Sequence, residues 1–132
     1  MAYLLDTNAV IAVLKEADTP IGRRVRECPP GEVFVSSIVL HELFYGAFKS
    51  ARTERNVALV EGLRFGLLEF GREDGRDAGE IRALLAAKGT PIEPYDVLIA
   101  GQARARGMVL ITRSTGEFAR VPGLVMENWE AA

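Results

Sequence analysis

Three acidic residues occupy positions where the surrounding sequence is otherwise apolar. Asp6 ends the short apolar run YLL, Glu42 interrupts the stretch SSIVLHELFYGAF, and Asp96 directly precedes the apolar run VLIAG. Each acid has an ordinary interpretation by itself, as a helix cap (Asp6), a partner of a helix dipole (Asp96) or part of a solvated helix face (Glu42). Together they would repel one another in buried surroundings, where a charge must be paired or bind a metal. The three carboxylates therefore predict a cation site.

Hard oxygen ligands of this kind suit Mg²⁺ or Mn²⁺, with water completing the coordination shell. Such a cation can activate water and neutralise the charge of a phosphoryl group. Other chemistries fit less well. The His41-Glu42 pair lacks the second histidine of a zinc protease, because Tyr45 holds that position, and neither a glycine-rich phosphate loop nor a G-x-S-x-G elbow occurs. Flavin binding on a similar sheet stays open, but it gives no reason for buried acids.

The composition is that of a soluble globular chain, with 48% hydrophobic and 26% charged residues in a length of 132 residues that suits one domain. The single cysteine, Cys28, excludes a disulfide framework. No basic segment precedes the opening apolar run and no stretch approaches membrane-spanning length, so we expect a cytoplasmic protein without a membrane partner. The net charge of −2 does not by itself suggest nucleic acid as a partner.

Short apolar runs at regular intervals predict strands at residues 3–6, 33–35, 109–111 and 124–126, and the pattern allows a fifth at 67–70. Helical patterns fill the intervals, over residues 8–16, 19–28, 38–49, 74–88 and 94–106, with another from the charged stretch 52–55 to a point before Gly66. We expect Ser37 to cap the helix at 38–49 and Pro94 to occupy a first helical position.

This alternation of strands and helices requires crossover connections. It predicts an α/β fold with a mostly parallel central sheet of four or five strands, flanked by helices on both faces. In such sheets the carboxyl ends of the strands and the N-termini of the helices meet at one edge, where ligands bind. Asp6, Glu42 and Asp96 are all predicted to lie at that edge.

Three segments together resemble the PIN domain, and more narrowly the VapC toxins of bacterial VapBC toxin–antitoxin pairs: YLLDTNAVI, SSIVLHELFYGA and GTPIEPYDVLIAGQARARGMVLITRSTGEFARVPGLVMENW. The resemblance covers nearly the whole length and implies a single PIN-like domain over residues 1–132. It implies an endoribonuclease that depends on Mg²⁺ or Mn²⁺ and inhibits growth or translation. It also implies a homodimer, and a cognate VapB-type antitoxin that blocks RNA cleavage within a toxin–antitoxin hetero-oligomer.

The resemblance assigns catalytic and metal-binding roles to Asp6, Glu42 and Asp96, which match the three main family acids. There is one departure, because Ser114 stands where the family usually carries Asn or Asp. Glu117 either supplies the fourth metal-binding acid or only begins a short helical turn, and both interpretations stay open.

Hydroxyl and amide groups near the acids are expected to orient water or phosphate, in particular those of Asn8, Thr112 and Ser114. Several arginines are further candidates for phosphate contacts: Arg104, Arg106, Arg113 and Arg120. For the antitoxin we expect an apolar groove near Phe44, Tyr45 and Phe48. Two other functions stay open: a catalytically weakened PIN-like module that binds RNA or protein, and a metal-dependent DNA nuclease.

Overall fold

The computed structural model describes residues 1–15 and 18–130. Its strands form one parallel sheet in the order β3-β2-β1-β4-β5. The strand bounds are β1 Tyr3–Leu5, β2 Val33–Ser36, β3 Gly66–Leu68, β4 Val109–Ile111 and β5 Met126–Glu127. The predicted α/β fold with a parallel sheet of four or five strands is thereby confirmed.

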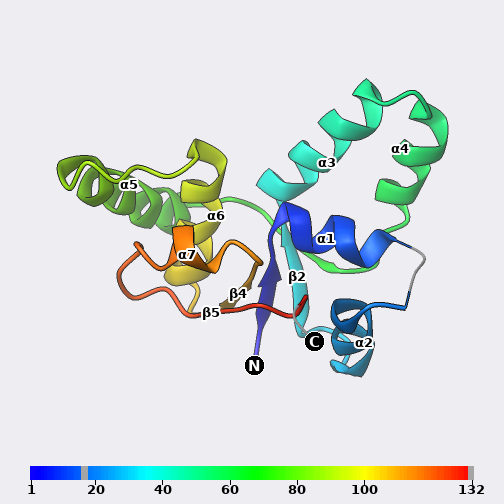
Figure 1. Ribbon diagram of the computed structural model, residues 1–132, viewed down its shortest axis with the longest axis horizontal. Helices are drawn as coiled ribbons and strands as arrows, with labels where there is room; N and C mark the ends of the chain where they lie inside the picture. The colour runs from blue at the N-terminus through cyan, green and yellow to red at the C-terminus, as the bar shows by residue number, and fades with distance from the viewer. Residues whose placement is uncertain (16–17, 131–132) are drawn as a thin grey trace.

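Helices fill the intervals between the strands, as the alternating pattern predicted. Their bounds are α1 Thr7–Leu14, α2 Pro20–Glu27, α3 Ser37–Lys49, α4 Thr53–Glu61, α5 Arg72–Ala87, α6 Pro94–Ala105 and α7 Thr115–Phe118. The predicted final residue of the first helix, Glu16, lies outside the described residues. Figure 1 shows the α3–α4 pair and the α5–α6 pair held apart, with β1 and β2 between them.

The central strands form the middle of the hydrophobic core. Leu4 and Leu5 of β1 and Leu110 and Ile111 of β4 have no exposed surface. A parallel strand buried on both faces reads as a continuous apolar run rather than an alternating one. This explains why YLL and VLI were recognisable in the sequence.

Several predicted boundaries are wrong by one or two residues. Ser36 rather than Ser37 caps α3, because β2 continues to Ser36 and the Ser36 hydroxyl accepts a hydrogen bond from the backbone N–H of Ile38 at 3.0 Å. Helix α5 begins at Arg72 rather than Asp74, because the Asp74 carboxylate accepts from the N–H of Gly71 and closes the first turn.

The outer strands also differ from their prediction. Strand β3 spans Gly66–Leu68 instead of 67–70 because the next segment leaves the sheet, and the N–H of Phe70 donates to the Ser37 hydroxyl at 3.1 Å. Strand β5 spans Met126–Glu127 instead of 124–126, because its register pairs Met126 with Leu110. Both shifts lie at the margins of the sheet, where apolar patterning is weakest.

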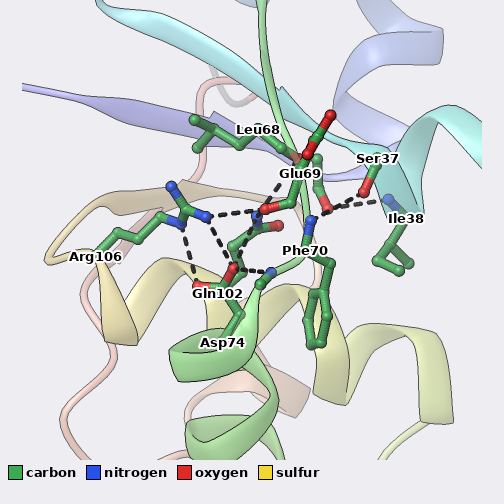
Figure 2. Close-up of polar contacts among 10 residues, drawn as sticks. Ser37, Ile38, Leu68, Glu69, Phe70, Asp74, Gln102 and Arg106 are labelled. Carbon is green, nitrogen blue, oxygen red and sulfur yellow. Dashed lines mark hydrogen bonds and ion pairs between the residues drawn. The ribbon is translucent and has the colours of Figure 1, made fainter.

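A polar network joins the two helices that carry Glu42 and Asp96. In Figure 2 the Asp74 carboxylate of α5 meets the side chains of Arg106 and Gln102 at the C-terminal part of α6. The Gln102 and Arg106 side chains also donate to the carbonyl oxygen of Glu69, at 3.2 and 2.9 Å. The next residue, Phe70, donates its backbone N–H to the hydroxyl of Ser37 at the start of α3. Residues 69–70 therefore connect α6 with α3.

Burial alone would raise the pKa of Asp74, but hydrogen bonds from Arg106 and Gly71 outweigh it and lower that pKa. Close packing fixes α6 as well: a Cβ at Gly101 would lie 2.6 Å from backbone atoms of Ala78 in α5. Only glycine permits this approach of the two helices. Helix α6 is therefore held both by packing and by charged hydrogen bonds.

Candidate active site

Asp6 lies at the carboxyl end of β1, in the middle of the sheet. Its Oδ1 accepts a hydrogen bond from the backbone N–H of Ala9 at 2.8 Å, so it does cap α1. The side chain is nearly buried, with 4% of its residue surface exposed. Burial raises the pKa of Asp6, and hydrogen bonds from Thr112 and Ala9 only partly offset that increase. Capping alone does not explain such a costly position for a carboxylate.

Glu42 lies in the second turn of α3 and is half-buried. The Thr7 hydroxyl, from the first residue of α1, donates to its Oε1 at 2.8 Å. Burial raises the pKa of Glu42, and repulsion from Glu93 and Asp6 raises it further against the hydrogen bond from Thr7. Glu42 is therefore less solvated than a residue on an open helix face.

Asp96 lies in the first turn of α6, where the Glu93 carboxylate caps the helix by accepting from the Asp96 N–H at 3.1 Å. Burial raises the pKa of Asp96 to about 7, together with repulsion from Glu93, Glu117, Asp6 and Glu42. Glu93, Glu117, Asp6 and Glu42 therefore all lie near enough to Asp96 for their charges to act on it. We refer to these five residues as the acidic cluster.

The donor chemistry of the acidic cluster fits a hard divalent cation. In the part of the chain that the structure describes, no three His, Cys, Asp or Glu side chains close around one point as a metal cage. Mg²⁺ is usually held by only one or two carboxylates and keeps several waters, so it does not need such a cage. Neutralisation by a cation would also remove the repulsion that raises the pKa of Asp96.

Comparison with known proteins identifies the family. A family model described as "PIN domain" matches residues 3–124. The chain belongs to the PIN-domain family. Over 131 residues it is 43% identical to the tRNA(fMet)-specific endonuclease VapC of Salmonella typhimurium, covering 98% of each chain. It is 39% identical to ribonuclease VapC2 of Haemophilus influenzae, with the same coverage.

Solved structures agree with the VapC relationship. A chain in the crystal structure of DNA-bound VapBC from Salmonella typhimurium superposes with a TM-score of 0.92 at 43% identity, covering 98% of both chains. A chain of VapBC2 from Rickettsia felis, bound to a promoter DNA fragment, superposes with a TM-score of 0.89 at 32% identity, covering 98% and 99%. PIN-domain ribonucleases generally depend on a divalent metal ion.

The PIN-domain chain has two more predicted site residues in the loop after β4. Thr112 is 1% exposed, hydrogen-bonds the Asp6 carboxylate with its side chain and accepts from the N–H of Ser114 at 2.9 Å. Ser114 precedes α7 and brings no charge. Asn8, in contrast, is exposed in the first turn of α1.

Glu117 is the acidic residue that follows Ser114, three positions later. It lies within the short helix α7, which begins at Thr115, so Glu117 does not itself begin the helical turn. Its carboxylate also accepts from the N–H of Glu93 at 3.3 Å and raises the pKa of Asp96. Glu117 therefore belongs to the helix and to the acidic cluster at once.

Two residues of the site were missed by sequence reasoning. Glu93 directly precedes Pro94, and because proline favours the first helical position, the residue before it could have been recognised as the cap. Thr7 carried no such signal, since its partner Glu42 lies 35 residues away. His41 is exposed at the surface, and its ring contacts Tyr95 with centroids 5.6 Å apart.

An apolar groove of about 400 Å³ adjoins the acidic cluster between α1, α3 and α4. Its described lining residues are Ile11, Leu14, Lys15, Glu42, Leu43, Gly46, Ala47, Arg55, Asn56, Leu59 and Val60. The described lining of this cavity does not include Phe44, Tyr45 or Phe48, and the antitoxin groove expected near those residues stays a prediction. Phe44 lines a smaller hollow of about 180 Å³, while Tyr45 and Phe48 are 61% and 64% exposed.

Among the helices of residues 1–15 and 18–130, we find none with the length and hydrophobicity needed to cross a lipid bilayer.

Proposed function

We propose that this PIN-domain chain is a metal-dependent endoribonuclease and the toxin of a toxin–antitoxin pair. The observation that carries the proposal is the acidic cluster at the carboxyl edge of the sheet, in a chain whose curated relatives are VapC ribonucleases. Since relatives from Salmonella and Shigella are named for tRNA(fMet), initiator tRNA is the first RNA to test.

Asp6 and Asp96 would bind the metal ion directly, while Glu42 would orient a water molecule or bind a second ion. Glu117 would complete the ligand set. When bound, Mg²⁺ or Mn²⁺ supplies a water of lowered pKa and stabilises negative charge on the phosphate. The carboxylates of the cluster give up their mutual repulsion on binding the ion, which favours a fully ionised site.

Hydroxyl groups of the chain itself orient the carboxylates of this site. The Thr7 hydroxyl donates to the Glu42 carboxylate, and Thr112 hydrogen-bonds that of Asp6, so each acid is oriented by at least one hydrogen bond. Asn8 and Ser114 remain candidates for orienting water or phosphate. Positioned groups of this kind cost no reorganisation during the reaction, which is how a preorganised polar site lowers the barrier.

Cleavage assays with and without a divalent ion test this proposal against the two alternatives. With about 10 mM Mg²⁺ or Mn²⁺ we expect the protein to cut RNA, and to leave it intact in a chelator. Single-stranded and duplex DNA of the same sequence should stay intact. RNA binding without cleavage would favour the weakened binding module, and equal cleavage of DNA would favour the general nuclease.

The apolar groove is the proposed docking site of a VapB-type antitoxin. An amphipathic helix could lay its apolar face into this groove, and Glu42 at its margin offers charge for a basic residue of the partner. An arginine reaching the acidic cluster would form charge-assisted hydrogen bonds and block the site. We propose that the toxin is itself a homodimer within the resulting hetero-oligomer.

Leu59→Glu is expected to weaken antitoxin binding by roughly 100-fold, because it places a charge in a desolvated apolar contact. Leu59 is 40% exposed, so the variant should still fold. Phe48→Glu is the control, because Phe48 is an apolar residue of α3 that is even more exposed, at 64%, and is not part of the groove lining. Titration of each variant with the purified antitoxin measures the affinities. A larger loss of antitoxin affinity for Phe48→Glu than for Leu59→Glu would mean that the antitoxin binds the face of α3 that carries Phe48 and not the groove.

A further inference from the structure

The structure separates the four arginines that the sequence offered as phosphate contacts. Arg104 is 16% exposed in its side chain and donates to Asp77 at 2.8 Å. Arg106 donates to both carboxylate oxygens of Asp74, at 3.1 and 2.9 Å, and to the carbonyl oxygen of Glu69. Both guanidinium groups are therefore engaged in holding α5 against α6. A phosphate could bind them only by breaking these contacts.

Arg120 donates to the carbonyl oxygen of Pro91 at 3.2 Å, which joins α7 to the loop before α6. Arg113 differs from the other three. Its side chain is 57% exposed, and its Nη1 lies 3.9 Å from Oε1 of Glu130, which is too long for a hydrogen bond. Within the described residues we find no hydrogen bond from this guanidinium.

Arg113 is also placed next to the acidic cluster by the backbone. It lies between Thr112, which hydrogen-bonds Asp6, and Ser114, whose N–H donates to Thr112. Hydrogen bonds of the residues on both sides of Arg113 therefore hold this loop beside Asp6. Arg113 and Glu130 both act on the charge of Asp6, the first lowering and the second raising its pKa.

Glu130 is a poorly hydrogen-bonded partner for Arg113. Its side chain is 21% exposed, and its Oε2 is buried without a hydrogen-bond partner in the part of the chain that the structure describes. A buried carboxylate oxygen with no donor is unfavourable. The long contact with Glu130 therefore keeps the positive charge of Arg113 near the acidic cluster, but it does not bind the guanidinium tightly.

We infer that Arg113 binds a phosphate of the RNA beside the cleaved bond, and that Glu130 holds its guanidinium at the site until RNA arrives. The inference rests on the proposed ribonuclease function. The acidic cluster is negatively charged, so a cationic side chain beside it would favour the binding of a phosphate there. The planar fork of arginine matches two phosphate oxygens. Exchange of one loose carboxylate contact for two charged hydrogen bonds favours the RNA-bound state.

RNA affinity measured across salt concentrations tests this role separately from cleavage. Every protein would carry Asp96→Asn, so that a labelled single-stranded oligoribonucleotide stays intact in Mg²⁺. Arg113→Ala should bind it roughly tenfold more weakly at low salt. The slope of log affinity against log salt should fall by about 0.7, the value for one lost phosphate contact on a single strand.

Two further variants distinguish a phosphate contact from other effects. Arg23→Ala removes an exposed arginine that is paired with Asp18 at 3.2 Å, and it should change neither affinity nor slope. Glu130→Gln removes the partner of Arg113 but keeps its shape. If Arg113 binds phosphate, Glu130→Gln should leave RNA affinity equal or higher, because less negative charge surrounds the site.

An unchanged salt slope for Arg113→Ala would overturn the inference. So would equal losses of affinity for Arg113→Ala and Glu130→Gln, since Arg113 would then act only by pairing with Glu130. If the otherwise unmodified chain cleaves RNA in either case, the proposed function stands and only the role of Arg113 falls. If that chain neither binds nor cleaves RNA, both fall together.

Discussion

Asp96→Asn is expected to slow RNA cleavage by at least about a hundredfold, because removing even a group that merely orients a metal ligand costs roughly 10- to 100-fold. Asparagine keeps the shape of the side chain but removes the charge that would bind the cation. In bacteria, the same substitution should relieve the growth arrest that toxin expression without an antitoxin is expected to cause. Single-turnover cleavage rates and growth curves measure the two effects.

Asp18→Asn provides the matched control for this loss of charge. Asp18 is exposed and pairs with Arg23 and Arg26 on the surface, so its substitution should leave cleavage and growth arrest unchanged. Unfolding cannot account for the expected loss at Asp96, since relief of repulsion should stabilise the metal-free variant. Full cleavage or full toxicity of Asp96→Asn would remove Asp96 from the catalytic site.

The fold and the position of the main acids were predictable because they depend on local sequence. Strands buried on both faces leave short apolar runs, and the order of runs and helices requires a parallel sheet. Asp6 follows the first of these runs, and Asp96 follows Pro94 within a helical turn. In a parallel sheet both positions fall at the same edge, so the cluster could be expected before its geometry was known.

Side-chain pairs between distant segments were not predictable from the same patterns. The bond from Thr7 to Glu42 spans 35 residues, and that from Glu93 to Glu117 spans 24. Nothing local marks such partners. Whether such a pair forms depends on which face of each helix is turned toward its neighbours when the helices pack on the sheet.

The groove proposed for the antitoxin illustrates the same limit on a larger scale. Helix α3 is apolar around most of its circumference, so its sequence did not reveal which face stays open. The structure lines the groove with Leu43 and Ala47, while Tyr45 and Phe48 face solvent on another side. The neighbours α1 and α4 decide this, because they cover one face of α3 and leave a hollow beside it.

Without a divalent ion, the protein is expected to lose stability as the pH rises from about 4 to about 7. The pKa of Asp96 is about 7 in the folded state against 3.8 in the unfolded chain. Between these values the folded state binds more protons, so the free energy of unfolding falls with pH. The raised pKa values of Asp6 and Glu42 act in the same direction. Asp74, whose pKa is lowered, acts oppositely but below this range.

The shift at Asp96 corresponds to about 4 kcal/mol, and solvent screening of a partly exposed group reduces this to roughly 2 kcal/mol. For a domain of this size, that is a fall of roughly 6 °C in Tm. Asp96→Asn should remove most of this fall. Thermal melts between pH 4 and pH 8 in a chelator, for the wild type and Asp96→Asn, measure the difference.

A divalent ion should offset most of the loss, because it binds the ionised carboxylates and therefore favours the folded state most at high pH. With a Kd near 1 mM, about 10 mM Mg²⁺ would add roughly 1.4 kcal/mol at pH 8, and much less to Asp96→Asn. Equal Mg²⁺ shifts in both proteins would mean that the ion binds elsewhere. A metal-free Tm that rises between pH 5 and pH 8 would mean that the carboxylates of the acidic cluster do not repel one another, and the cation site would lose its physical basis.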